Sequence, residues 1–328
     1  MATQLPKVGI VLLNWNGAED TLECLRSLRG SSYPNYFIVI VDNGSAGDDV
    51  QILRREAADC HIIANGRNDG FSEGNNIGMR YALAHDADYV LILNNDAVVA
   101  PGLLDVLVDV AERDESVGVL APRIRLYDDP GKVAYPRKVD TWPLFLYFHL
   151  GTLGIFNRGI MEKGSEPIPV RSVDGCCLLV RREVLTRVGL FDPLYFVGGY
   201  ESLCLCRRTL SHGFRILAAP DAAIRARVSR SLGGRRKAAL TYAYWNPRNR
   251  VIFARRYLSW PHYLLFLLGL PVHVFVWTFG WGRKARMVEK VPALLRGLRD
   301  GFKTDLAGTP EQIRALTLEA ESAGQAAR

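Results

Sequence analysis

The chain has 328 residues, of which 48% are hydrophobic and 23% are charged. This composition is typical of a globular protein with one large core or two moderate ones, and it excludes a disordered chain. The formal net charge of +7 favours an anionic partner, such as nucleotide phosphates, acidic lipid headgroups or nucleic acid, without choosing among them.

The six cysteines are too few for a disulfide scaffold in a chain of this length, and their spacing does not suit a zinc site. Cys176, Cys177, Cys204 and Cys206 lie in apolar runs typical of a core strand or helix. The N-terminus leads directly into a predicted strand, without the basic segment and long apolar stretch of a signal peptide. We therefore expect reduced thiols and a cytoplasmic location.

Three apolar runs predict strands buried on both faces, at residues 8–13, 36–41 and 89–93. Small polar residues follow each run, in the motifs 14–17, 42–45 and 94–96. A predicted helix over 19–28 joins the first two strands in a βαβ unit, which is right-handed almost without exception. Because ligands bind outside the carboxyl ends of parallel strands, we expect a mononucleotide site at this edge of a mostly parallel α/β sheet. Each polar motif taken alone could also be a plain turn.

The remaining elements of the first two thirds alternate in type. We expect helices at 50–58, 77–85, 101–113 and 181–188, and strands at 60–64, 117–122 and 170–180. A glycine- and amide-rich loop is expected at 65–76. The segment 127–169, which contains the aromatic stretch 142–148, is expected to be a loop region or an exposed apolar patch.

The segment 258–282 contains no Asp, Glu, Lys or Arg, and basic residues flank it on both sides. Its length would permit a transmembrane helix. Because Pro261 and Pro271 interrupt it, a re-entrant or surface-lying helical pair with a turn at 269–271 fits better, and a buried helical hairpin is the alternative. Trp260, Trp277 and Trp281 would then lie at the lipid headgroups. A basic amphipathic helix is expected at 291–302, followed by a tail at 306–328 with a weak helix at 310–320.

The polar motifs 14–17, 42–45, 68–76 and 94–96 resemble, in order and spacing, the nucleotide-sugar half of the family-two inverting glycosyltransferases, in the rhamnosyltransferase-like branch of bacterial polysaccharide synthesis. The stretches 174–182 and 188–192 resemble the acceptor half of the same family. The resemblance runs from about Val8 to Gly234 and implies a GT-A (Rossmann-like) fold with flanking helices. It divides the chain into a nucleotide-sugar half (1–125), an acceptor half (126–235), a membrane-associating helical region (236–305) and a tail (306–328).

The resemblance also implies roles for individual residues. Nucleotide-sugar binding is carried over to Asn14, Asn16, Asp42, Asn43, Asn68, Gly74, Asn75 and Asn95. Acceptor binding is carried over to Asp174 and Gly175. Asp96 would hold a divalent cation, Mg²⁺ or Mn²⁺, on the diphosphate, which agrees with the preference of hard cations for carboxylate and phosphate oxygens. For Asp42, a capping or turn role is the alternative.

Two positions depart from the family pattern. The family's general base, an aspartate after a glutamate, falls on Ser202, and its usual histidine falls on Ala226. Because a hydroxyl is a poor base, Glu201 would take over that role, with Arg227 and Arg230 on the diphosphate. The alternative is a catalytically degenerate subunit that binds nucleotide or a partner without turnover.

The implied donor is a nucleotide-diphosphate sugar, similar to dTDP-rhamnose or a UDP-sugar, and the implied acceptor is a polysaccharide or a lipid-linked glycan. We expect a peripheral or re-entrant position on the cytoplasmic face of the cell membrane. Nucleic-acid binding is not expected, because the arginines gather beside an apolar stretch rather than alternating with exposed aromatic residues.

Overall fold

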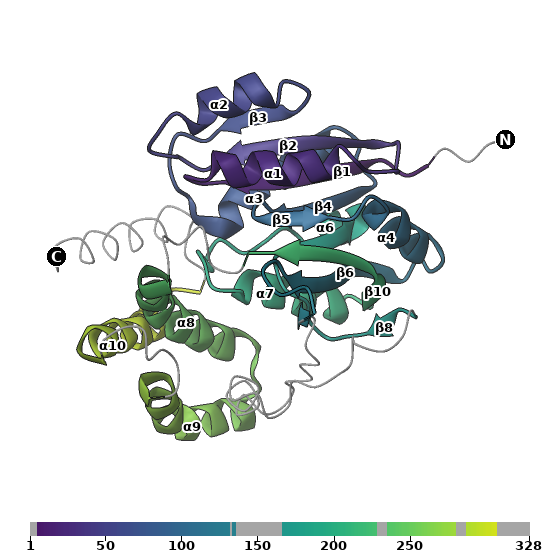
Figure 1. Cartoon of the computed structure of the whole chain (residues 1–328). Coiled ribbons are helices and arrows are strands. Elements are labelled where there is room, and N and C mark those ends of the chain that lie inside the picture. Colours follow the sequence, from purple (N-terminus) through teal and green to yellow (C-terminus); the bar gives the residue numbers. More distant parts are fainter. Residues whose placement is uncertain (1–4, 132, 136–165, 228–234, 280–286, 307–328) are drawn as a thin grey trace. The chain divides into compact units, whose positions relative to one another are not determined.

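The structure is a computed structural model that describes residues 5–131, 133–135, 166–227, 235–279 and 287–306 (Figure 1). The chain divides into two compact units. The first comprises Met1–Asp140, Asn157–Phe191 and Ser202–Ser231, and the second comprises Thr141–Phe156, Asp192–Glu201 and Leu232–Arg328. The expected aromatic patch at 142–148, the tail, Arg230 and Trp281 lie outside the described residues.

The first unit is built on one mixed sheet with the strand order β3-β2-β1-β4-β9-β6-β10-β5. The strands are β1 (Val8–Asn14), β2 (Tyr36–Asp42), β3 (His61–Ala64), β4 (Tyr89–Asn94), β5 (Ala97–Val99), β6 (Val117–Leu126), β9 (Cys177–Arg181) and β10 (Arg215–Ala226). Two short strands, β7 (Val133–Tyr135) and β8 (Ile168–Pro169), pair with β6 and β10.

The order in which strands are added to the sheet reverses between β1 and β4. It builds β1, β2 and β3 outward in parallel and then returns to place β4 on the other side of β1, also in parallel. Asn14 at the end of β1 lies in register with Asp42 at the end of β2. Such a switch point leaves an opening at the carboxyl ends of the two central strands, where ligands bind in open α/β sheets.

The expectation of a mostly parallel sheet is corrected by β9, which lies antiparallel between β4 and β6. The described strand is also shorter than the predicted one at 170–180. Its residues from Cys177 to Val180 are completely buried. An unbroken apolar run indicates a strand buried on both faces, but it carries no information on the strand's direction.

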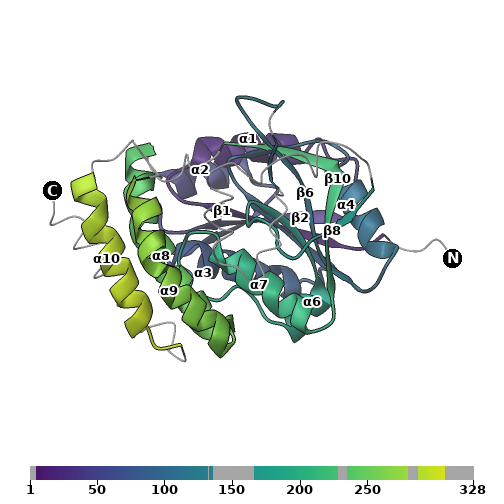
Figure 2. The same ribbon diagram turned by 90° about the horizontal axis from the view of Figure 1, so that it is seen from below.

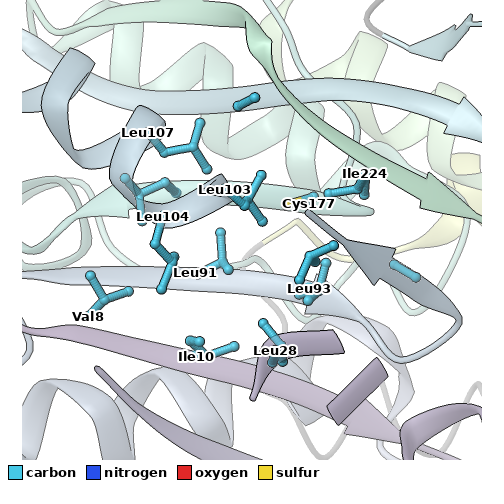
Figure 3. Close-up of a cluster of buried hydrophobic side chains, with 14 of the residues drawn as sticks. Val8, Ile10, Leu28, Leu91, Leu93, Leu103, Leu104, Leu107, Cys177 and Ile224 are labelled. Atoms are coloured by element: carbon cyan, nitrogen blue, oxygen red, sulfur yellow. The ribbon is translucent and has the colours of Figure 1, made fainter. Parts of the chain in front are cut away.

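Helices cover both faces of this sheet (Figure 2). They are α1 (Ala18–Leu28), α2 (Asp49–Glu56), α3 (Gly70–Ala84), α4 (Leu103–Glu112), α6 (Arg182–Arg187) and α7 (Tyr200–Ser211). Along β1, Ile10 and Leu12 belong to the core beneath α1 and α4, whereas Val11 belongs to the core beneath α3. Figure 3 shows the first of these clusters, with Leu91 of β4 beside Leu104 of α4. The sheet is therefore buried on both sides, as the apolar runs predict.

Helix α3 begins at Gly70, so residues 70–76 form its first turns and the prediction of a loop there is wrong. The glycines that suggested a loop serve close packing instead. A Cβ atom at Gly74 would lie 2.5 Å from a methyl group of Leu13, and one at Gly78 would collide with Val11. Glycine costs a helix about 1 kcal/mol relative to alanine, and the close approach of α3 to β1 offsets this cost.

The second unit contains α8 (Arg235–Tyr257), α9 (Trp260–Phe279) and α10 (Met287–Lys303). Helices α8 and α10 lie side by side (Figure 1). The expected turn at 269–271 is wrong, because α9 continues through Pro271. The predicted helix at 291–302 is confirmed as part of α10. None of the helices in the described residues has both the length and the apolarity needed to cross a bilayer.

Candidate functional site

Asn14, the last residue of β1, is the centre of a buried hydrogen-bond network at the switch point. Its side-chain amide donates to the Oδ2 atoms of Asp42 (2.8 Å) and Asp49 (2.9 Å). Its Oδ1 accepts from the hydroxyl of Thr21 (2.7 Å), which itself accepts from the amide of Asn95 (2.9 Å). We call these residues, together with Ser45, the strand-end network. It joins the ends of β1, β2 and β4 to α1 and α2, so three of the predicted residues, Asn14, Asp42 and Asn95, come together.

Three members of the strand-end network were not predicted from the sequence. Ser45 closes a turn, with its hydroxyl 2.6 Å and its backbone nitrogen 3.1 Å from the Asp42 carboxylate. Asp49 accepts from the backbone nitrogens of Gly17 (2.8 Å) and Ala18 (3.1 Å), and it thereby caps the N-terminus of α1. Ser45 lay within a predicted motif, whereas the contact of Thr21 with Asn95 and that of Asp49 with Asn14 join distant parts of the sequence and gave no local signal.

A second set of amides holds the loop before α3 against the loop after β2. The Asn43 amide donates to Asn68 Oδ1 (3.0 Å) and to the Gly70 carbonyl (3.1 Å). Asn65 donates to Asn43 Oδ1 (3.2 Å) and to Asp69 Oδ2 (2.9 Å). Asn43 and Asn68 are therefore brought together as expected, and their contacts fix the shape of this edge of the sheet.

The predicted nucleotide-sugar residues Asn16 and Asn75 bind backbone groups through their side chains. Asn16 has a positive φ of 50°, and its Oδ1 accepts from the backbone nitrogen of Ala46 (2.8 Å). Asn75 is buried in α3 and donates to the Phe71 carbonyl (2.8 Å). Within the described residues, Asn75 Oδ1 is buried without a hydrogen-bond donor. An unpaired buried acceptor is costly, by about 1–3 kcal/mol, so this atom is a natural position for a ligand donor or water.

The carboxylates of Asp96 and Asp174 both influence the environment of Cys176. Asp96 is buried in the turn between β4 and β5, and Asp174 Oδ1 accepts from the Cys176 backbone nitrogen (2.9 Å). Burial raises the pKa of the Cys176 thiol well above its ordinary value, and the carboxylates of Asp174 and Asp96 raise it further. The Cys176 carbonyl also accepts from the backbone nitrogen of Asn94 (2.8 Å). The predicted cation ligand and acceptor residue thus belong to the same edge of the sheet.

Arg227 is held by Glu23 of α1 through two hydrogen bonds of 2.6 and 2.9 Å. Its guanidinium lies 3.6 Å from the ring centre of Tyr127, whose hydroxyl also donates to Glu23 (2.8 Å). The hydrogen bond from Arg227 lowers the pKa of the Glu23 carboxyl. In this arrangement, the fork of Arg227 that was predicted to bind phosphate is directed at a carboxylate.

Glu201 is the second residue of α7, and its side chain is buried, as is that of Ser202. The carboxylate therefore does not face solvent. The chain reverses immediately before α7 at Gly198 and Gly199, which have φ values of 118° and 81° that favour glycine.

Helix α8 holds residues 192–200, the segment that leads to Glu201. Arg248 donates to the Leu194 carbonyl (2.8 Å), Asn249 to the Val197 carbonyl (2.7 Å), and Arg250 to the Tyr200 hydroxyl (3.3 Å). Arg256 forms an ion pair with Asp192, and Phe196 stacks on Trp245 at 5.0 Å. Burial lowers the pKa of Arg248. The sequence showed these residues, but nothing local in it indicated that Arg248 and Asn249 bind backbone carbonyls some fifty residues earlier.

A family model described as glycosyl transferase family 2 matches residues 9–189, which is more than half of the chain and includes the strand-end network. The chain belongs to this family. The resemblance drawn from the polar motifs is therefore confirmed, and the chain is an enzyme of the glycosyltransferase class.

Two relatives place this family-2 glycosyltransferase in the rhamnosyltransferase-like branch. The N-acetylglucosaminyl-diphospho-decaprenol L-rhamnosyltransferase of Mycobacterium tuberculosis is 28% identical over 267 residues, covering 76% of this chain and 85% of the relative. The dTDP-rhamnosyl transferase RfbF of Shigella flexneri is 26% identical over 195 residues, covering 57% of this chain and 58% of the relative.

The fold expected for a family-2 glycosyltransferase is confirmed by comparison with solved structures. The mannosyltransferase PcManGT of Pyrobaculum calidifontis, in complex with GDP-Man and Mn²⁺, matches with a TM-score of 0.55 at 19% identity, covering 99% of this chain and 82% of that one. This likeness establishes a GT-A-like α/β fold with a mixed sheet.

Proposed function

We propose that this glycosyltransferase moves a sugar from a nucleotide-diphosphate-sugar donor to a glycan or lipid-linked glycan acceptor, with inversion at the anomeric carbon. The observation that carries the proposal is the strand-end network at the switch point of a family-2 chain. The names of the relatives support a rhamnose-like donor sugar and a diphospho-lipid acceptor.

The donor's nucleoside would lie against Asp42. A carboxylate accepts about four hydrogen bonds, and Asp42 accepts from the Asn14 amide, the Ser45 hydroxyl and the Ser45 backbone nitrogen. One acceptor position on Oδ1 is thus left for a ribose hydroxyl or a base N–H. Asn75 Oδ1 offers a second acceptor on α3, and Asn16, Asn43, Asn68 and Gly74 would shape the surrounding wall.

A divalent cation would be held by Asp96. Its carboxylate is the kind of donor that Mg²⁺ and Mn²⁺ prefer, but the described residues contain no group of three His, Cys, Asp or Glu able to hold a metal ion. The remaining ligands would therefore come from the diphosphate and from water. When bound, the cation would offset the negative charge of the departing diphosphate.

Glu201 would act as the general base. In a single displacement, the acceptor hydroxyl oxygen forms a bond to the anomeric carbon while the bond from that carbon to the diphosphate oxygen breaks. The hydroxyl proton goes to the Glu201 carboxylate, and the electron pair of the broken bond leaves with the nucleoside diphosphate. Attack opposite the leaving group gives inversion. The hold of α8 on residues 192–200 supports this role because it fixes the chain that carries Glu201.

The acceptor would meet Asp174 and Gly175, and Arg227 would assist the diphosphate by exchanging Glu23 for phosphate oxygens. A lipid-linked acceptor would place the enzyme on the cytoplasmic face of the cell membrane. No specific observation favours the alternative of a degenerate subunit.

The test measures transfer from dTDP-rhamnose, UDP-N-acetylglucosamine and GDP-mannose, with and without Mg²⁺ or Mn²⁺, together with thermal-shift titrations of the same donors. We expect one donor to stabilise the protein and to be turned over. NMR of the product should show an anomeric configuration opposite to that of the donor. Glu201→Gln should lower kcat by roughly two to four powers of ten, whereas Asp221→Asn, at an exposed site on β10, should not. Stabilisation without turnover would favour the degenerate subunit, and no response to any donor would overturn the proposal.

A further inference from the structure

Helix α9 is apolar on both sides. It has 20 residues, none of them Asp, Glu, Lys or Arg. Its inner side packs in a cluster with α8 and α10, where Phe266 is buried with Val251 and Leu294, and Tyr263 and Leu270 pack at the edge. This cluster accounts for one side of the helix and leaves the other to be explained.

The other side of α9 is exposed, and we call it the outer face. Its large side chains are between 41% and 76% exposed: Trp260, Leu264, Leu265, Leu268, Val272 and Phe275. The spacing of these residues by three and four places them along one side of the helix. A water-facing helix normally carries polar residues there, so a continuous apolar strip indicates a surface that another apolar medium covers.

The charge of the surrounding chain points to the nature of this medium. Between residues 235 and 288 there are ten lysines and arginines and no aspartate or glutamate. Four of the arginines bind groups of the protein itself: Arg248, Arg250, Arg255 and Arg256. The remaining six cations lie at 235–237 and 283–286. Helix α10 adds exposed Arg296, Arg299 and Lys303, beside exposed Leu295 and Phe302. Apolar side chains flanked by cations match the interface of a bilayer that contains anionic lipids.

Two other occupants fit less well. A second copy of the chain would bring two segments of the same positive charge together with no acidic residues between 235 and 288 to pair with them. A membrane-crossing position fits less well, because the inner side of α9 packs against α8 and α10.

We propose that the outer face of α9 lies in the headgroup and upper acyl region of an anionic membrane, with the helix axis along the surface. An isolated interfacial helix exposes a charged face to water. In α9 the side turned away from the membrane packs against α8 and α10 instead. Only the purpose of this contact, access to a lipid-linked acceptor, rests on the proposed function. Helix α8 contacts both α9 and residues 192–200, which lead to Glu201. The same helix therefore positions the lipid-binding face and the chain that carries Glu201.

The test is flotation of the full chain with vesicles of phosphatidylcholine alone or mixed with phosphatidylglycerol. We expect binding to the anionic vesicles that weakens in high salt. The double variant Leu268→Glu and Val272→Glu should reduce the bound fraction by about tenfold or more, because it places two charges in the apolar layer. Leu5→Glu, at another exposed leucine, should bind like the wild type.

Because Leu268, Val272 and Leu5 are exposed, we expect all the variants to fold, and thermal melts check this. Equal binding of wild type and the double variant, or no binding of the wild type, would overturn the proposal. A wild-type dimer in light scattering that the double variant converts to monomer would overturn it in favour of self-association. Donor-induced thermal shifts in the absence of lipid are read separately, so that failure of the lipid surface is distinguished from failure of the transferase.

Discussion

The side-chain amide of Asn95 donates to the hydroxyl of Thr21 over 2.9 Å, and this contact joins the end of β4 to helix α1. Thr21 passes the connection to Asn14 and so to Asp42 on β2. The polar ends of two strands on opposite sides of β1 are therefore fixed relative to each other through one buried hydroxyl. The shape of the predicted donor site depends on this relationship.

Replacing the hydroxyl of Thr21 should disturb both stability and donor binding. Thr21→Val keeps the volume but leaves Asn14 Oδ1 without its donor and Asn95 without its nearer acceptor, so we expect a loss of about 1–3 kcal/mol in the free energy of unfolding. Donor affinity in thermal-shift titrations should fall by about tenfold. Thr186→Val is the control, because Thr186 is exposed and bonds only to carbonyls of its own helix. Equal effects of the two changes would contradict this role.

The glycines of α3 should tolerate no side chain. Gly78→Ala brings a Cβ atom into Val11, a buried side chain branched at its own Cβ, so chemical denaturation should show a loss of about 1–3 kcal/mol. This outcome is opposite in sign to the effect of helix propensity alone, which favours alanine by about 1 kcal/mol. Gly47→Ala, where nothing lies within 4 Å, should be neutral or slightly stabilising. A stabilised Gly78→Ala protein would show that helix propensity outweighs the contact with Val11 at this position.

The hold of α8 on residues 192–200 should appear in catalysis. Asn249→Ala removes the 2.7 Å bond to the Val197 carbonyl and should lower kcat more than it changes the KM of the donor, because it loosens the chain that carries Glu201. Arg255→Ala is the matched control on the same helix, since Arg255 bonds to Gly301 and Thr304 instead. It should lower the melting temperature without a selective loss of kcat. A similar kcat for both variants would show that α8 has a purely structural role.

The cysteines should resist alkylation while the protein is folded. Burial raises the pKa of Cys60 and of Cys206 to about 12, so both thiols stay protonated at about pH 8, where only a thiolate reacts quickly. Burial also keeps the reagent away from five of the six cysteines, all except Cys60. Mass spectrometry should detect little labelling by iodoacetamide until denaturant is added, and then six labels. Rapid labelling of a native thiol other than that of Cys60 would contradict the burial.

The contact between Glu23 and Arg227 should contribute to stability in a manner that depends on pH. The hydrogen bond from Arg227 lowers the pKa of Glu23 from its ordinary 4.5, so the stabilisation is present above 4.5 and is lost as the pH falls through the lowered value. Because both side chains are partly exposed, its size should be about 1 kcal/mol or less. The difference in unfolding free energy between wild type and Glu23→Gln should therefore shrink below the ordinary pKa. A difference that does not change with pH would exclude the ion pair as its source.

The sequence by itself determined the parts that repeat a local pattern. Apolar runs of five or six residues defined β1, β2 and β4, and the polar residues directly after them marked the edge of the sheet where the strand-end network lies. The agreement of several such motifs in order and spacing was sufficient to indicate the family. Cys176, Cys177, Cys204 and Cys206 were expected in core elements because their apolar neighbours are a local property too, and all four are buried.

Only the tertiary structure decided what depends on partners distant in the chain. The direction of β9, the early start of α3 against β1, and the uninterrupted course of α9 through Pro271 all follow from packing, which overrides the local preferences of glycine and proline. Thr21 binds Asn95, Asp49 binds Asn14, and Arg248 binds the Leu194 carbonyl, each through a hydrogen bond between residues far apart in the sequence. A buried polar group has to be paired wherever the fold brings a partner, and no neighbouring residue in the sequence records where that will be.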